Sequence, residues 1–319
     1  MWSYLARRLI QAIITLFIIT IVCFTLTRLS ADPMAQYATS QRMSAADREA
    51  LRHRLGLDQP LPVQYLRWLG LALQGELGTS FFSKQPVSKL ILERVPMTLK
   101  LMVTAEVMIV IAAVTLGVVS AVKQYSFVDN LITTFSFIGF SMPIFFIGLM
   151  LMLIFAVQFK LWGLPYLPTG TDIWDFNDLG ELVRHLILPV TCLVTIQVAG
   201  YSRFLRSSIL EVLGQDYIRT ARAKGLVERT VLFRHALRNA ALPFVTILGL
   251  DLASLLGGAL VTESVYAWPG MGRLFWEYAQ RGDFPVVNGV LLMISSAVVF
   301  FTIVTDLVYT FVDPRIRLG

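Results

Sequence analysis

The sequence carries little charge for its length, and this scarcity excludes most soluble classes. Only 15% of its 319 residues are charged, against 56% that are hydrophobic, and the mean hydropathy is +0.67. Soluble domains carry about 25% charged residues, and one core of this size cannot bury so much apolar surface. Disorder, a nucleic-acid-binding tail and a disulfide scaffold are excluded on the same grounds. The composition predicts a membrane protein.

Cysteine, histidine and phosphate-binding glycine patterns are also scarce. Cys23 and Cys192 lie in apolar runs, where a thiol behaves as a small hydrophobic group. His53, His185 and His235 are far apart and have no metal-ligand spacing. The sequence contains no Gly-Lys dipeptide, hence no Walker-type loop, and no Gly-x-Ser-x-Gly elbow. We therefore expect no catalytic residue, no metal site, no cofactor and no ATP hydrolysis in this chain.

Long hydrophobic runs, in contrast, recur along the chain. A membrane-spanning helix needs about 20 mostly apolar residues, and six stretches qualify: 9–27, 101–122, 131–157, 186–201, 242–261 and 286–312. We expect the first to be a retained helix, and the fourth to continue as helix past Tyr201. Pro143 should kink the third, because proline removes a backbone donor. The predicted fold is all-α, with one transmembrane domain over residues 1–319.

The positive charge is concentrated in one connecting segment. Residues 200–241 hold eight basic and three acidic residues, which supplies +5 of the net charge of +6. Basic connections favour the cytoplasmic side, and Arg7 and Arg8 before the first span agree with this. The pattern predicts cytoplasmic termini, a cytoplasmic loop at 202–241, and external segments at 28–98, 158–185 and 262–285. Nucleic acid is not an expected partner.

Small residues and one aromatic stripe predict helix packing. Small residues at four-residue spacing allow close approach of helices in lipid, and they occur at Ala113, Gly117 and Ala121, and at Gly249, Ala253 and Gly257. In the external segment, an apolar stripe is expected either to pack on the bundle or to lie on the membrane surface; its members are Tyr65, Leu66, Trp68, Leu69 and Leu73.

Three carboxylates lie within or near the ends of the apolar runs. Glu106, Asp251 and Asp306 are functional candidates, because ionisable groups are costly to place in a membrane. Glu106 and Asp306 are near helix ends, where they can reach the interface. Asp251 is nearest the middle of a span and shares a helix face with Ser254 and Gly258, which makes these three the candidate translocation pathway.

Residues 216–225 predict a short, complete helix within the basic loop. Asp216 is a suitable N-cap, Arg222 and Lys224 suit the negative helix end, and Gly225 suits the position after the last turn. Such a helix is compact enough to dock in a pocket of another protein. Contact with anionic lipid headgroups is the alternative that the residues leave open.

Short motifs occur along nearly the whole chain. In order, they are Asp32-Pro33, Leu55–Pro60, Gly75–Ser80, His185–Pro189, Tyr217–Gly225, Phe233–Ala240, Glu263–Gly272 and Asp313–Arg317. Together they resemble the dipeptide/oligopeptide/nickel permease family of ABC importers. Arg219-Thr220-Ala221 stands where the wider superfamily has Glu-Ala-Ala, so a contact of that glutamate does not carry over.

The resemblance implies an inner-membrane permease subunit of a bacterial ATP-driven, binding-protein-dependent importer. Its implied partners are a second, similar permease, two cytoplasmic ATPase subunits and an extracytoplasmic solute-binding protein. The solute is expected to be a di- or oligopeptide, with nickel, glutathione or another small solute as alternatives. The residues implied to couple to the ATPase are Asp216, Tyr217, Arg219, Thr220, Ala221, Arg222, Ala223, Lys224 and Gly225, with Tyr217 and Ala221 on the apolar side.

Two other classes remain open. A secondary transporter would use Asp251, with Glu106 or Asp306, to carry protons, and its uptake would not need ATP. A purely structural membrane protein would show no transport defect on deletion. The capped basic helix and the resemblance both favour the ATP-coupled class.

Overall fold

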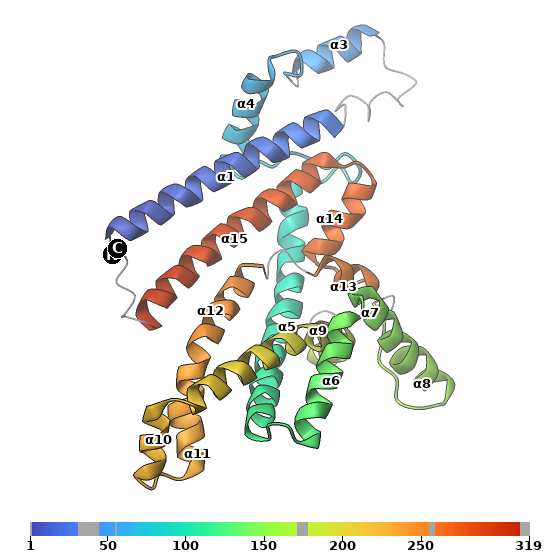
Figure 1. Cartoon of the computed structure of the whole chain (residues 1–319). Helices are drawn as coiled ribbons and strands as arrows, with labels where there is room; N and C mark the ends of the chain where they lie inside the picture. Colours follow the sequence, from blue (N-terminus) through green and yellow to red (C-terminus); the bar gives the residue numbers. More distant parts are fainter. Residues whose placement is uncertain (1, 31–44, 55, 171–177, 255–258, 313–319) are drawn as a thin grey trace.

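The computed structural model describes residues 2–30, 45–54, 56–170, 178–254 and 259–312. Within these ranges the protein is helical, and its only β pairing is an isolated bridge between Thr79 and Pro86. The helices are α1 (Trp2–Ser30), α3 (Ala45–Arg54), α4 (Leu61–Leu73), α5 (Val87–Val122), α6 (Phe127–Ser141), α7 (Ile144–Met152), α8 (Phe159–Leu161), α9 (Leu179–Leu213), α10 (Asp216–Ala223), α11 (Glu228–Thr230), α12 (Arg238–Ser254), α13 (Leu260–Val265), α14 (Met271–Gln280) and α15 (Phe284–Val312) (Figure 1). Two π-helical segments, Leu153–Gln158 and Val231–Leu237, join α7 to α8 and α11 to α12.

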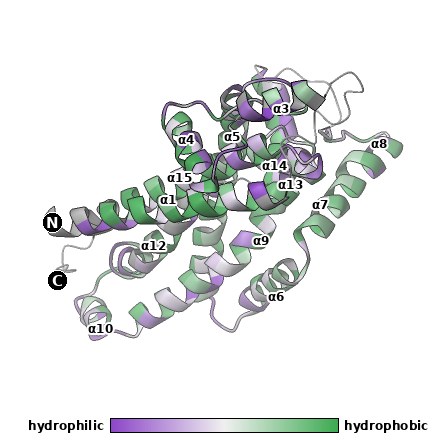
Figure 2. Cartoon of the chain, turned by 90° about the horizontal axis from the view of Figure 1, so that it is seen from above, coloured by the Kyte–Doolittle hydropathy of each residue, from purple (hydrophilic) through white to green (hydrophobic). Residues whose placement is uncertain are grey.

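Five of the described helical stretches are long and apolar enough to cross a membrane: Arg7–Leu26, Val87–Val122, Ile144–Leu161, Leu179–Leu213 and Phe284–Thr305. The span predicted at 242–261 overlaps α12, but residues 255–258 lie outside the described part of the chain. That span therefore stays a prediction. Figure 2 shows hydrophobic residues along α1 and α7, and hydrophilic residues on α3 and α10.

Two helices differ from the helices that the sequence predicted within the spans. The helix expected at 101–122 begins at Val87, within the predicted external segment, because Val87 and Ile91 are buried against residues of α14 and α15. The helix expected at 131–157 is not kinked at Pro143 but interrupted. Met142 and Pro143 are extended, with ψ angles of 138° and 137°, since proline disfavours the helical region for the residue before it.

Close helix packing forms where small residues were expected. Among the described helices, α5 and α9 share the most extensive contact. A Cβ added at Gly117 of α5 would lie 3.1 Å from both the Leu205 Cβ and the Ser202 carbonyl oxygen of α9. Gly249 of α12 lies against Thr305 of α15, whose hydroxyl donates to the Gly249 carbonyl oxygen at 2.8 Å. Both contacts occur within this chain.

The aromatic stripe of α4 is divided between two environments. The Tyr65 hydroxyl lies 2.8 Å from Thr20 Oγ1 of α1, and the rings of Tyr65 and Trp68 both contact Phe24. Leu66 and Leu73 point away and are 64% and 80% exposed. The stripe therefore packs on α1 through Tyr65 and Trp68, while Leu66 and Leu73 remain exposed.

The short helices lie toward the ends of the long ones. α10, α11 and the turn between α5 and α6 lie at one end of the molecule, which we call the α10 end (Figure 1). α3, α4 and α14 lie toward the other end, which we call the α14 end (Figure 1).

Candidate coupling site and buried carboxylates

α10 is a complete helix that follows directly on α9. Gly214 and Gln215 are the two residues between them, and Gln215, not Asp216, is the N-cap. Asp216 instead occupies the first helical position, where its carboxylate still favours the positive helix end and accepts a hydrogen bond from Arg219 at 3.3 Å. The predicted cap was therefore wrong by one residue.

The other end of α10 is as predicted. Gly225 has a φ of +76°, which lies in the left-handed region that favours glycine. Its N–H donates to the Arg222 carbonyl at 2.9 Å, and the Leu226 N–H donates to the Ala221 carbonyl at 3.4 Å. These two bonds form a Schellman motif, which ends the helix and satisfies its last carbonyl groups.

A small apolar core holds α10 on its own chain. Ile218 and Ala221 are 0% and 7% exposed and pack with Val231 and Ala236 of the following π-helical segment. The expectation that Ala221 lies on the docking side was therefore wrong. Positions three apart share a helix face, and here that face is used to attach the helix.

The opposite side of α10 is polar and open. Tyr217 is 45% exposed, and its hydroxyl accepts a hydrogen bond from Asn239 at 3.2 Å. The remaining coupling residues named from the sequence are all exposed: Asp216, Arg219, Thr220, Arg222, Ala223, Lys224 and Gly225. The helix thus presents a charged surface with one aromatic ring.

An ion pair links α10 to α11, the short helix that follows it. Arg222 donates two hydrogen bonds to Glu228, at 2.6 Å and 3.1 Å, and holds the pKa of that carboxyl below its usual value. A cavity opens beside the pair, with Val122 and Leu213 at the ends of α5 and α9 and Phe233 among the residues that line it.

Asp129 is a buried carboxylate that the sequence interpretation missed. It lies in the first turn of α6 and is 3% exposed. Its oxygens accept hydrogen bonds from Arg206 Nη2 at 2.8 Å and Nε at 3.0 Å, from the Tyr125 N–H at 2.8 Å, and from the Ser120 hydroxyl. The Arg206 guanidinium holds the pKa of Asp129 well below its usual range. From the sequence, Arg206 counted only as one charge of the basic segment.

Glu263 is a second buried carboxylate, at the α14 end, and belongs to a motif that had no assigned role. It is 0% exposed and accepts hydrogen bonds from the Thr98 hydroxyl and the Arg273 N–H, both at 3.0 Å, and from the Gly272 N–H. Because the last two donors begin α14, the carboxylate caps that helix. A Cβ added at Gly270 would collide with it, which explains the glycine.

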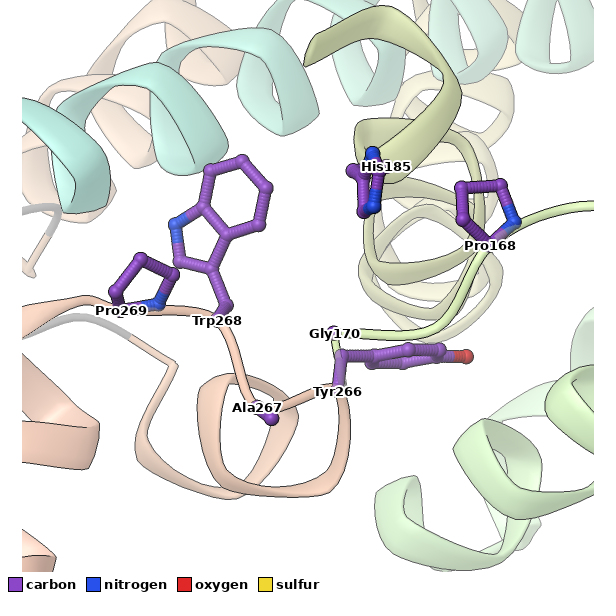
Figure 3. Close-up of a pocket in the computed structure, with 7 residues that line it drawn as sticks. All are labelled: Pro168, Gly170, His185, Tyr266, Ala267, Trp268 and Pro269. Carbon is purple, nitrogen blue, oxygen red and sulfur yellow. The ribbon is translucent and has the colours of Figure 1, made fainter. Parts of the chain in front are cut away.

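Two of the motifs that carry the family resemblance meet at the loop 266–270, between α13 and α14. His185, from the motif at 185–189, lines a small pocket together with Tyr266 and Trp268 (Figure 3). Trp268 Nε1 donates to the Met97 carbonyl at 2.9 Å, and the Tyr266 hydroxyl donates to the Gly148 carbonyl at 3.1 Å. Figure 3 shows the two rings leaving the loop in different directions. The loop therefore joins α5 to α7.

The candidate pathway residues are only partly placed. Asp251 of α12 is half-buried, and its charge lies within interaction range of Glu106 on α5. Gly258 and the side chains of Ser254 and Asp306 lie outside the described residues. The structure thus describes two of the three carboxylates that were singled out, Glu106 on α5 and Asp251 on α12, and the charge of Asp251 acts on Glu106. Within the described ranges, no group of three or more His, Cys, Asp or Glu residues could hold a metal ion.

Comparison with known proteins identifies the family. Residues 113–318 match the model of the binding-protein-dependent transport system inner membrane component, and residues 1–102 match the model of its N-terminal part. Oligopeptide transport system permease protein AppB of Bacillus subtilis is 42% identical over 322 residues, covering 99% of this chain and all of that protein. Dipeptide transport system permease protein DppB of Escherichia coli is 37% identical over 336 residues, and Di/tripeptide transport system permease protein DppB of Pseudomonas aeruginosa is 38% identical over 338; each match covers 99% of both chains. The chain therefore belongs to the inner membrane components of binding-protein-dependent transport systems, as a multi-pass permease subunit.

Proposed function

We propose that the chain is the transmembrane subunit of an ATP-driven importer for di- or oligopeptides. The full-length similarity to proteins named as peptide permeases supports the substrate class. The observation that carries the ATP-coupled mechanism is α10. Its own chain anchors it through Ile218 and Ala221, and its other side presents charged groups and one aromatic ring.

In this proposal, a cytoplasmic ATPase subunit docks on the exposed side of α10. Tyr217 supplies the aromatic contact, and Arg219 and Lys224 supply charge and hydrogen-bond donors. Closure of two ATPase subunits would then displace α10 and switch the spans between inward- and outward-facing states, a rigid-body form of alternating access.

The proposed topology has six spans and cytoplasmic termini. The basic segment 200–241 and the turn between α5 and α6 lie at the same end, which supports a cytoplasmic α10 end. The proposed partners are a second, similar permease, which forms the other half of the pathway, two ATPase subunits, and a solute-binding protein that contacts segments 28–98 and 262–285. ATP hydrolysis belongs to the ATPase partners, and this chain needs no cofactor of its own.

Affinity purification from gently solubilised native membranes tests the assembly. We expect a second permease, Walker-motif ATPases and a solute-binding protein to co-purify with the tagged chain. Equilibrium binding of the purified binding protein to dipeptides, oligopeptides, nickel and glutathione then identifies the solute. Recovery of the chain alone, with solute uptake in vesicles that lack ATP, would overturn the proposal.

A secondary transporter is the second candidate, and the electrostatic influence of Asp251 on Glu106 is the observation that favours it. Carboxylates that act together within a membrane can relay protons. This mechanism predicts uptake that collapses with the proton gradient and persists without ATP. Under the ATP-coupled proposal, Asp251→Asn and Glu106→Gln change solute passage but leave uptake independent of the gradient.

A further inference from the structure

Two arginines of α9 attach α6 along most of its length. Arg206 makes the bidentate pair with Asp129 in the first turn of α6. Arg203, almost one turn earlier in α9, lies 4.6 Å from the ring centroid of Phe137 and 5.4 Å from that of Phe140. Guanidinium groups at these distances are attracted by the aromatic faces. The two arginines therefore hold both the beginning and the end of α6.

The interface between α6 and α9 also contains a close contact with the backbone. A Cβ added at Gly139 of α6 would lie 3.0 Å from the Thr195 carbonyl oxygen of α9. Such close packing leaves α6 little freedom to slide along α9, because interiors packed at this density transmit displacement.

α9 is also the helix that carries α10. Only Gly214 and Gln215 separate the two helices, and Val212 and Leu213 at the end of α9 pack against the small core under α10. A displacement of α10 therefore reaches Arg206, which lies two turns before the end of α9.

α6 and α7 were predicted as one span, but they contact different stretches of α9. The extended residues Met142 and Pro143 separate them. α6 contacts α9 at Thr195, Arg203 and Arg206, whereas α7 packs on an earlier part of α9, where the Cys192 thiol donates to the Ile144 carbonyl at 3.5 Å. The Gly148 carbonyl of α7 also accepts a hydrogen bond from Tyr266, in the loop that Glu263 anchors. A displacement at the end of α9 therefore acts first on α6, and the break at Met142 and Pro143 means that α6 and α7 do not move as one rigid rod.

Stability alone is a poor explanation for this ion pair, in which the side chain of Asp129 is 4% exposed and that of Arg206 is 25% exposed. Removing the Asp129 charge from water costs much of what its attraction to Arg206 returns, and apolar pairs of similar volume are often as stable. What the pair adds is a fixed geometry, because two parallel hydrogen bonds between guanidinium and carboxylate set both distance and orientation.

We propose that Asp129 and Arg206 are positioning residues of ATP-coupled transport, through which movement of α10 reaches α6. The inference rests on the proposed function, since it takes α10 to be the helix that the ATPase moves. The pair acts as a strut between α6 and α9, and its loss uncouples ATP hydrolysis from solute passage without dissociating the complex.

The test uses the complete transporter with its partners, reconstituted in liposomes. The readout is the amount of ATP hydrolysed per solute taken up, together with the melting temperature of the complex. In the double variant Asp129→Asn with Arg206→Met, the amide oxygen still accepts from the Tyr125 N–H, the amide NH2 can donate to the Ser120 hydroxyl oxygen, and the methionine fills the volume of the arginine stem. We expect an unchanged melting temperature and a rise of about tenfold in ATP per solute, within the usual range of coupling energies.

A conservative variant and a surface control complete the design. Arg206→Lys keeps the charge but not the bidentate geometry, so it should give an intermediate rise. The control is Lys160→Gln, which removes an exposed cation 5.2 Å from the Tyr166 ring centroid, outside both proposed docking surfaces, and should leave the ratio unchanged. A wild-type ratio in a folded Arg206→Lys or double variant contradicts the coupling role of the Asp129–Arg206 pair but leaves the proposed function unaffected. Uptake by the wild-type transporter without ATP overturns the proposed function, and the strut with it.

Discussion

The two ends of the molecule each bury a carboxylate, and they satisfy it differently. Asp129 at the α10 end faces a cation on another helix and is 3% exposed. Glu263 at the α14 end is 0% exposed and receives a hydroxyl and two backbone N–H groups. Two of those three donors, the N–H groups of Gly272 and Arg273, lie in the first turn of α14, nine and ten residues after Glu263.

This difference separates two structural tasks. The Asp129–Arg206 pair links helices that are distant in sequence, so it can carry displacement between them. The Glu263 carboxylate fixes a local loop to the beginning of α14, as anions do at helix N-termini. The pKa directions agree: Arg206 lowers the pKa of Asp129, whereas burial raises the pKa of Glu263.

The largest expected effect is the loss of the Glu263 carboxylate. Glu263→Ala leaves the Thr98 hydroxyl and the N–H groups of Gly272 and Arg273 without their acceptor. Unsatisfied buried groups cost about 1–3 kcal/mol each, so we expect a destabilisation on the order of 3 kcal/mol or more. A large fall in the melting temperature of the purified chain in detergent is the measurement.

A neighbouring carboxylate provides the control for that experiment. Glu277 lies on α14, is 34% exposed in its side chain and pairs with Arg273 at 2.7 Å. Glu277→Ala should lower the melting temperature much less. Equal losses in the two variants would contradict the role of Glu263 as the cap of α14.

Gly225→Val is the next largest expected effect, at the α10 end. A β-branched residue held at a φ of +76° carries a strain of about 1–3 kcal/mol, which should displace the Schellman turn. We expect uptake to fall several-fold while the protein still inserts in the membrane. Gly225→Asn is the matched control, because asparagine tolerates this conformation; uptake as low in Asn as in Val would show that conformation is not the cause.

The pKa of Glu263 predicts a pH dependence that Asp129 does not share. A carboxyl whose folded pKa is raised binds its proton more tightly in the folded state, so stability is highest below its unfolded pKa of about 4.3 and falls as pH rises toward the folded value. Asp129, with a lowered pKa, contributes its full stability above its unfolded pKa of about 3.9 and loses it as pH falls from there toward the folded value. Melting temperatures measured from about pH 4 to pH 7 should therefore fall by less in Glu263→Gln than in wild type. The same slope in both would assign the pH dependence to other groups.

The sequence predicted the elements that depend on local rules. Gly225 ends its helix because left-handed backbone is a glycine property, and Gly117 and Gly249 make close contacts because small residues allow them. The interruption at Pro143 exceeded the predicted kink because Met142 leaves the helical region as well.

The sequence could not predict contacts that pair distant residues. Asp129 and Arg206 each look like ordinary charges at the end of an apolar run, and only the packing of α6 on α9 brings them together. Ala221 was assigned to the wrong side for a related reason. A helix of eight residues with two apolar positions on one face does not reveal whether that face binds its own chain or another.

The smallest expected effect is the loss of the exposed pair between Arg222 and Glu228. The two side chains are 44% and 64% exposed, and exposed pairs contribute about 0.2–1 kcal/mol. Glu228→Gln should therefore leave the melting temperature almost unchanged. It also leaves Arg222 without its partner beside the proposed docking surface, so ATPase affinity measured against ionic strength becomes the sensitive readout. A steeper salt dependence is expected if Arg222 then faces an acidic group of the ATPase. A large loss of stability would instead mean that this pair holds the segment after α10 in place.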